Sequence, residues 1–283
     1  MISRHLARWV GPLLVASLFV LVFIPSIARA ADQVILTWEQ DADGNPIDVG
    51  QVIDDEYHSA TAISVTIKTV SSTNVAAIFP SDDLPLRSGV TVDPDLGSPN
   101  ASCPGGGPGI GVGGEVGEPG ENCLSHENVL IMPTTGDSDS DGFIAGIPDD
   151  DDQGGTISFY FSEPVAIDFA EMLDQESEEN LTINSYADVA GTTLIDEQNP
   201  SGYGDNSYEN VVINAAGIRR VDFVFLGSGA IASLAFTPEE PTAVNISAFS
   251  AAAVAPGYLL LAAAFMMVLF TAAAVWLLRL YAG

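Results

Sequence analysis

Short apolar runs separated by Gly, Pro, Asn and Asp recur through the middle of the chain. In residues 63–70 apolar and polar side chains alternate, which places one face of a strand in a core and the other in water. Similar runs predict strands at 34–38, 75–79, 128–132, 156–161, 165–169, 181–186, 192–195, 210–213, 220–226 and 231–236. Residues 171–179 are compatible with one helical turn, but no amphipathic helix is predicted. This spacing predicts an all-β fold, an antiparallel β-sandwich over residues 31–237.

The longest apolar runs lie near the two ends of the sequence. Basic residues, an apolar stretch and the Ala28-Arg29-Ala30 motif predict a secretory signal helix over residues 1–30, with an uncleaved anchor as the alternative. The uncharged run Tyr258–Leu278, at ~1.5 Å per residue, is long enough to cross the ~30 Å hydrocarbon core of a bilayer.

These two runs predict a single-pass membrane protein whose sandwich is extracellular or periplasmic. Arg279 agrees with a cytoplasmic C-terminus. The small apolar residues before the membrane run are expected to form a stalk. The expected order is signal peptide 1–30, sandwich 31–237, stalk 238–257, transmembrane helix 258–278 and cytoplasmic tail 279–283.

Charge is distributed unevenly between the two signs. The chain has 38 Asp and Glu but only 8 Lys and Arg, and Lys68, Arg87, Arg219 and Arg220 are the basic residues of the expected ectodomain. Nucleic acids and anionic lipids are poor partners for such a surface, because phosphate contacts need Lys and Arg. Divalent cations and neutral or cationic polymers fit better. Solubility in a salty medium is the alternative explanation.

Cys103 and Cys123 enclose a glycine-rich stretch in the exported part of the chain, where oxidation is permitted. We expect a disulfide between them, with free thiols or metal ligation as the alternative. Residues 80–127, rich in Pro, Gly, Asp and Ser, are expected to form a long surface loop that this disulfide pins in place of a core.

The sharpest local pattern is Asp137-x-Asp139-x-Asp141-Gly142, which matches the first half of a calcium loop. An EF-hand requires Glu at its twelfth position, where this chain has Pro148, so the loop is not an EF-hand. The acidic run that follows can supply closing ligands, and a solvated acidic loop is the alternative. The predicted Ca²⁺ ligands are Asp137, Asp139, Asp141, Asp149 and Asp151.

Catalytic patterns are weak. His58 and His126 are the histidines outside the signal segment, and neither a G-x-S-x-G elbow nor a Cys–His nucleophile pattern occurs. We therefore expect a non-enzymatic protein. The alternative is a glycan hydrolase with a carboxylate pair, because the separation of such a pair depends on the fold. Tyr203 and Tyr208, in a polar segment, are candidates for stacking on sugar rings.

A resemblance to a known family rests on several stretches that occur here in the same order as in that family. They are Leu36–Pro46, Gly50–Tyr57, Leu96–Asn100, Cys103 with Glu121–Cys123, Asn128–Ile131, Asp149–Phe161, Gly204–Asn206 and Gly227–Ile231. They resemble a family of bacterial secreted sandwich domains on surface proteins with exchangeable C-terminal anchors, including the PEP-CTERM type. The resemblance implies a jelly-roll-like sandwich with a lectin-like or adhesive role. Two departures are Ala232 and Ser233, which replace the family's acid, and an anchor without an adjacent Pro-Glu-Pro or a basic cluster.

The predicted function is a membrane-anchored extracellular β-sandwich module that is non-enzymatic, stabilised by calcium and a disulfide, and in contact with glycans or extracellular matrix. Two alternatives remain at this point. One is a surface glycan hydrolase, and the other is a purely structural acidic protein of the cell envelope.

Overall fold

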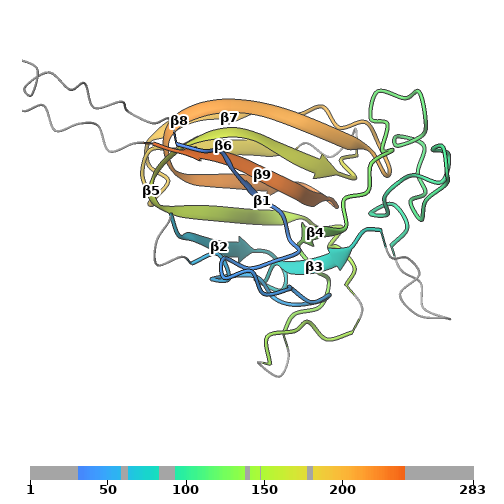
Figure 1. Ribbon diagram of the computed structural model, residues 1–283, viewed down its shortest axis with the longest axis horizontal. Helices are drawn as coiled ribbons and strands as arrows, with labels where there is room; N and C mark the ends of the chain where they lie inside the picture. The colour runs from blue at the N-terminus through green and yellow to red at the C-terminus, as the bar shows by residue number, and fades with distance from the viewer. Residues whose placement is uncertain are drawn as a thin grey trace, which may run out of the picture. The chain divides into compact units, whose positions relative to one another are not determined.

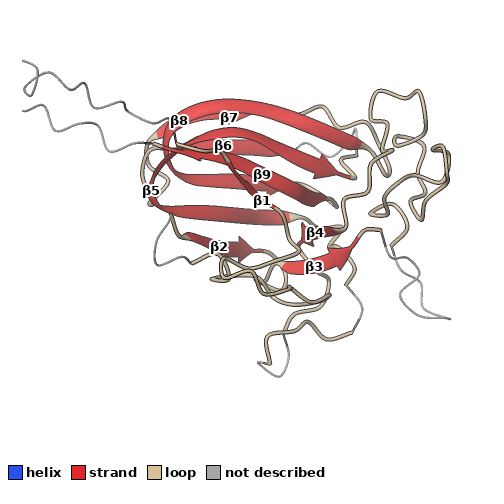
Figure 2. Ribbon diagram, in the orientation of Figure 1, coloured by secondary structure: helices blue, strands red, loops and turns tan. Residues whose placement is uncertain are grey.

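The computed structural model describes residues 31–58, 63–82, 93–137, 141–146, 148–176 and 181–239. Every regular element in these ranges is a strand (Figure 2). The described residues contain no helix with the length and apolar character needed to cross a membrane. The predicted signal helix and transmembrane helix, together with nearly all of the stalk, lie outside the described residues.

Nine strands are found in this part of the chain: β1 (Val34–Leu36), β2 (Val65–Val70), β3 (Ala77–Pro80), β4 (Asn128–Ile131), β5 (Gly155–Leu173), β6 (Thr182–Tyr186), β7 (Leu194–Gln198), β8 (Tyr208–Phe225) and β9 (Ala230–Pro238). They follow the order β3-β4-β9-β5-β8-β6-β7, with β1 paired to β9 and β2 paired to β5. All of these strand pairs are antiparallel, as predicted.

The long strands β5 and β8 join two halves of this sheet. The first part of β5 pairs with β2 and the end of β8, whereas the second part pairs with β9 and the beginning of β8. Register shifts between Tyr160 and Val165 accompany the change, and Gly217 of β8 adopts φ 76° near the same level. Both strands turn back at one end (Figure 1), so the sheet folds onto itself as a β-sandwich.

Two expectations about these strands are corrected. The runs 156–161 and 165–169 belong to one strand, and so do 210–213 and 220–226. The helical turn expected from residue 171 onward is wrong for its beginning, because residues up to Leu173 continue β5 and pair with β8 and β9.

The main core lies between the two halves of the folded sheet. Phe161 of β5 packs edge-on against Phe236 of β9, with ring centroids 5.1 Å apart. Trp38 is completely buried, and its indole N–H donates to the carbonyl of Ile231 at 2.7 Å. Fully burying side chains of this kind contributes roughly 1.5–3 kcal/mol each, so we expect this core to be the main source of the fold's stability.

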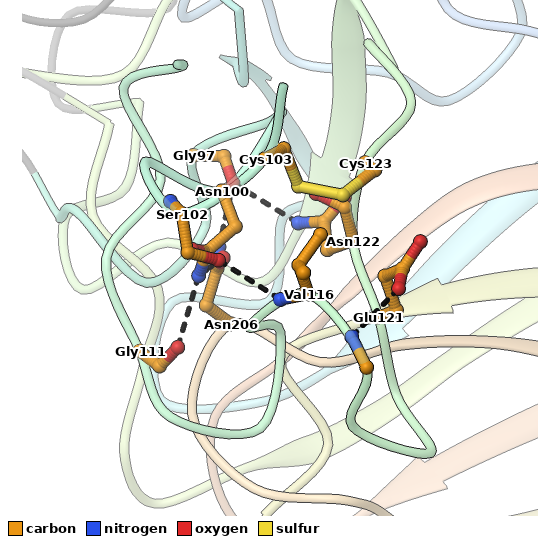
Figure 3. The surroundings of a disulfide bond; sticks show 11 residues. Gly97, Asn100, Ser102, Cys103, Gly111, Val116, Glu121, Asn122, Cys123 and Asn206 are labelled. Atoms are coloured by element: carbon orange, nitrogen blue, oxygen red, sulfur yellow. Dashed lines mark hydrogen bonds between the residues drawn. A yellow bond between two sulfur atoms is a disulfide. The ribbon is translucent and has the colours of Figure 1, made fainter. Parts of the chain in front are cut away.

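The long loop predicted over residues 80–127 is called the glycine-rich loop below. Its described part lies at the end of the sandwich opposite the bend (Figure 1). The disulfide Cys103–Cys123 is confirmed. Around it, buried asparagines connect distant segments (Figure 3): Asn100 Nδ2 donates to Asn206 Oδ1 at 2.7 Å, and Asn206 Nδ2 donates to the carbonyl of Gly97 at 2.6 Å. The expectation that the disulfide pins this loop in place of a core is therefore incomplete, because buried hydrogen bonds also hold the loop.

A small second core also holds the loop. Leu96 is buried together with Phe79, Val129, Ile131, Leu173, Ala230 and Ala232. The glycines themselves allow backbone segments to touch: a Cβ on Gly109 would lie 2.2 Å from the carbonyl oxygen of Gly97. The loop is thus packed by backbone contact and buried amides, which requires residues without side chains at these positions.

Candidate metal centre

Carboxylates from separate segments converge at the end of the sandwich that carries the glycine-rich loop. Asp93 and Asp95 precede Leu96, Asp149 and Asp150 lie between β4 and β5, and Asp174 directly follows β5. Asp93, Asp149 and Asp150 each offer one oxygen, and these oxygens all lie within 4.8 Å of one another. The five residues Asp93, Asp95, Asp149, Asp150 and Asp174 are called the carboxylate cluster below.

Backbone donors hold the two most buried members of the cluster. Asp150 is 8% exposed, and its Oδ2 accepts from the N–H of Gly229 at 2.6 Å. Asp174 is 1% exposed, and its Oδ1 accepts from the N–H of Asn206 at 2.6 Å. Because these N–H groups belong to the turns before β8 and β9, the loop geometry fixes where the carboxylates point.

Asp93 and Asp95 complete the cluster from the other side. The carboxyl of Asp93 shares hydrogen bonds with those of Asp95 and Asp150. The Oδ1 atom of Asp95 is buried and has no hydrogen-bond partner among the described residues. A hydrogen bond between two carboxyl groups requires a proton on one of them, so these contacts favour a partly protonated cluster when no cation is bound.

The electrostatics of the cluster follow from this burial. Burial raises the pKa of Asp93 to about 7, of Asp95 to about 8 and of Asp150 to about 7. Burial also raises the pKa of Asp174, and repulsion by the charge of Asp95 adds to that effect. Within the described ranges no Lys or Arg forms an ion pair with these groups, since the ion pair found there joins Arg220 to Asp222.

The donor set of the cluster fits a hard divalent cation. It consists of carboxylate oxygens, without the Cys or His ligands that zinc and copper prefer. Ca²⁺ takes six to eight oxygens in a flexible geometry, which suits ligands from several loops, whereas Mg²⁺ demands a near-ideal octahedron. A bound cation would replace the retained protons and satisfy the buried Oδ1 of Asp95.

The structure places the Ca²⁺ ligands predicted from sequence at different positions, and one of them lies in the carboxylate cluster. Asp149 lies in the carboxylate cluster. Asp151 is buried but accepts hydrogen bonds from Ser72 Oγ and the N–H of Gln153.

The remaining predicted ligands lie in the acidic loop after β4. Asp137 accepts from the N–H of Gly142 at 3.1 Å, and Asp141 accepts from that of Phe143 at 3.0 Å, so both carboxylates cap local turns. Asp139 lies outside the described residues. Asp150 belongs to the acidic run 149–152 that was expected to supply closing ligands. Asp93, Asp95 and Asp174 were not predicted, and the Asp93-x-Asp95 spacing was the sole local signal for the first two.

The two tyrosines predicted to contact sugars differ in accessibility. Tyr208 begins β8, stacks on His126 with centroids 4.9 Å apart, and donates from its hydroxyl to Glu171 Oε1 at 2.7 Å. Its ring is therefore engaged within the protein. Tyr203 is 40% exposed and lies beside the glycine-rich loop, where its Cβ would meet a Cβ placed on Gly120.

Comparison with known proteins adds little to this description. No family model matches the chain, and no curated protein matches it. One similar solved structure is "Truncated AlyQ with CBM32 and alginate lyase domains", with 17% sequence identity and a TM-score of 0.24. That match covers 32% of this chain and 26% of the other, and at this score it carries no argument about fold or function.

Proposed function

We propose that this chain is a non-enzymatic binding module, displayed outside the cell on a membrane-spanning tether, whose jelly-roll-like sandwich is organised at one end by a calcium ion. The observation that carries the proposal is the burial of Asp150 and Asp174 among further carboxylates, with no Lys or Arg paired to them in the described residues. The signal-like residues 1–30 and the apolar run 258–278 support the tether.

Calcium is the cation we propose because of the location as well as the ligands. Exported proteins meet calcium-rich media, where sites with affinities of ~0.1–1 mM are filled. The cation would join the segment before Leu96 to the β4–β5 connection and to the end of β5. It would thereby hold the base of the glycine-rich loop, which otherwise carries several like charges in one place.

The loop end of the sandwich is also where we propose contact with glycans or matrix polymers. Ile110 and Val112 of the glycine-rich loop are 61% and 70% exposed, and the exposed ring of Tyr203 lies next to this loop. Apolar and aromatic groups held on a rigid loop lose little conformational entropy when a partner covers them. This supports a binding role for the loop.

Thermal unfolding of the full chain in detergent tests the calcium proposal. Calcium at about tenfold above its Kd should stabilise the wild type by ~1.4 kcal/mol relative to chelator. Asp150→Asn should abolish this shift, whereas the matched variant Asp141→Asn, in the acidic loop, should keep it. The absence of a shift in the wild type, or its loss in Asp141→Asn alone, contradicts the proposed site.

The hydrolase alternative has one observation in its favour. Glu39 and Glu171 line one pocket of about 270 Å³, together with His126 and Ser233. Ser233 Oγ donates to Glu171 Oε2 at 2.6 Å, so the carboxylate is held in place. Release of reducing sugar from a polysaccharide panel, lost in Glu171→Gln, would replace the binding role with catalysis. No glycan binding, with or without calcium, would favour the structural role.

A further inference from the structure

One half of the folded sheet consists of β1, β9, the end of β5 and the beginning of β8, which are neighbours in this order (Figure 1). Strand register shows which side chains lie on its outward face. One row of paired side chains is buried in the main core: Leu36, Leu234, Ala170 and Val211. Successive side chains of a strand point to opposite faces, so the adjacent row points away from that core. This row, called the apolar row below, consists of Ile35, Ala235, Phe169 and Val212.

The apolar row is open to solvent at several of its positions. Ile35 at one end is 49% exposed, and Val212 at the other end is 60% exposed. Phe169 is partly buried, and Ala235 is buried between Ile35 and Phe169 in the register. With strands ~4.8 Å apart, the row is about 14 Å long. Exposed apolar side chains that are aligned across neighbouring strands, unlike single ones, indicate a surface that a partner covers.

Hydrogen-bonding groups border the apolar row on both sides. On the side of the glycine-rich loop, Glu171 and Ser233 are paired at the next register position. On the other side, Asp168 Oδ2 accepts from Gln33 Nε2 at 2.8 Å and from Thr237 Oγ1 at 2.9 Å. An apolar row between two polar borders matches a sugar ring, which has apolar faces and hydroxyl groups around its edge.

A pocket of about 270 Å³ continues this face where it meets the glycine-rich loop. The loop contributes Ser125, His126 and Glu127 to the pocket, and the sheet contributes Glu171 and Ser233. The Nε2 atom of His126 is buried and has no hydrogen-bond partner among the described residues. An unpaired buried nitrogen is unfavourable, so a polar ligand that reaches it adds to the free energy of binding.

The carboxylates of this surface all have the same sign of charge, with no Lys or Arg beside them in the described residues. Those of the pocket and of the apolar row are Glu39, Glu127, Glu171 and Asp168, and Asp82 adds another beside Ser125. Burial lowers the pKa of His126, which disfavours a positive charge in the pocket. The described Lys and Arg lie in the other half of the sheet: Lys68 on β2, and Arg219 and Arg220 beyond the bend of β8.

We infer that this outward face and its pocket bind a polysaccharide that carries free amino groups, such as a polymer of glucosamine. Sugar rings pack on Ile35, Phe169 and Val212, and their ammonium groups pair with Glu171 and the neighbouring carboxylates. Charge complementarity selects this partner, because an anionic polymer is repelled and a neutral one gains no ion pairs. The inference rests on the proposed role as a glycan-contacting module and names its class of glycan, but it does not require the calcium site.

Hexamers of glucosamine and of N-acetylglucosamine are matched probes, since they share a backbone and differ in charge. Binding to the full chain in detergent is measured by isothermal titration calorimetry in ~0.15 M salt, which limits diffuse attraction to the acidic chain. At about pH 6.5 the sugar amine is protonated, because its pKa resembles that of an α-amino group. We expect the acetylated hexamer to bind about tenfold more weakly. Equal binding of both, or no binding of the glucosamine hexamer, would overturn the inference.

Two double variants locate the binding surface. Asp168→Asn with Glu171→Gln removes two charges but keeps hydrogen-bond acceptors for the neighbouring hydroxyls, and it should weaken binding of the glucosamine hexamer about tenfold. Ile35→Thr with Val212→Thr makes two exposed apolar positions polar without lowering strand propensity, and it should weaken binding about threefold.

The matched control is Asp196→Asn with Glu197→Gln. It removes the same charge from β7, which pairs with β6 in the other half of the sheet, and it should leave binding unchanged. A loss of binding as large as in Asp168→Asn with Glu171→Gln would show that the hexamer responds to net charge alone, and would overturn the inference.

Hexalysine tests the class of partner, because it has cationic groups without sugar rings. If it binds as tightly as the glucosamine hexamer and is lost in the same variants, the face belongs to basic peptides and the inference is wrong. Cleavage of the glucosamine hexamer would assign the pocket to catalysis and also overturn it. Binding of other polysaccharides without preference for amines would reject this inference and keep the glycan-contacting role, whereas no binding of any glycan would reject both.

Discussion

Asp174 carries its carboxyl group in surroundings that disfavour the ionised form. It is 1% exposed and lies beside other carboxyl groups, so its ionised form is unfavourable when no cation is bound. Its two oxygens accept hydrogen bonds from the N–H of Asn206 and the hydroxyl of Ser228. These donors orient the side chain without neutralising its charge, which would suit a ligand of the proposed cation.

Replacing Asp174 by Asn should therefore have opposite effects with and without calcium. In chelator at pH 8 the variant should melt higher by on the order of 2–4 °C, the shift that ~1 kcal/mol causes in a domain of this size, because a repelled charge is removed. In calcium the stabilisation should disappear, because a ligand is lost. Differential scanning calorimetry checks both signs, and a lower melting temperature in chelator would show that Asp174 serves packing alone.

Gly109 tests the backbone packing of the glycine-rich loop. A Cβ there would lie 2.2 Å from the carbonyl oxygen of Gly97, and neither segment is free to retreat. Gly109→Ala should lower the free energy of unfolding by about 2 kcal/mol, as overpacking does. Gly136→Ala is the control, because its Cβ would meet Thr73 at 3.5 Å, an ordinary contact, so denaturant titration should find it neutral or up to about 1 kcal/mol more stable.

At the scale of elements, the disulfide closes a loop whose ends are separated by 20 residues. Its main effect is expected in the unfolded chain, where removing the cross-link restores about 3 kcal/mol of conformational freedom. The double variant Cys103→Ala, Cys123→Ala should lose about that much stability in urea titration. Wild type unfolded in reducing agent should match the variant, whereas a much larger loss in the variant would mean that the thiols also serve packing.

The apolar pattern predicted where strands lie better than how long they are. The alternation in residues 63–70 and the run 128–132 both correspond to strands, β2 and β4. The segment Ser162-Glu163-Pro164, by contrast, has the composition of a turn, yet β5 continues through it. The exposed side chains there lie at the bend between the two sheet halves, where a polar sequence marks curvature instead of an ending.

At the scale of the whole molecule, the candidate metal centre depends on contacts that local sequence cannot encode. Asp149 was predicted because it belongs to a visible acidic run, and Asp174 was missed because it stands at the end of a strand with an apolar face. What brings the two together is the return of β5 to the end at which it began. Local spacing therefore predicted an ion-binding chemistry from one acidic run, while the fold determines which carboxylates lie close together.

The same cluster predicts how stability of the whole chain depends on pH. Carboxyl groups whose pKa rises from 3.8 to about 7 or 8 on folding bind more protons in the folded state than in the unfolded state. Without calcium this contribution to stability is complete below pH ~4, and it is lost as pH rises through 7 and 8. Under the proposed function, bound calcium would displace those protons, so the calcium-bound form should avoid the loss.

The difference in melting temperature between calcium and chelator should therefore grow from pH 5 to pH 8.5. Subtracting the value in chelator from the value in calcium cancels the pH dependence that comes from groups outside the cluster. His126 is one such group: burial lowers its pKa, so its contribution to stability changes with pH in the opposite direction. Asp150→Asn should flatten the pH dependence in chelator as well as abolish the difference, because it removes one of the shifted carboxyls. A difference that stays constant with pH would mean that calcium binds carboxylates already ionised at the surface, as in an exposed acidic loop, and not the buried cluster.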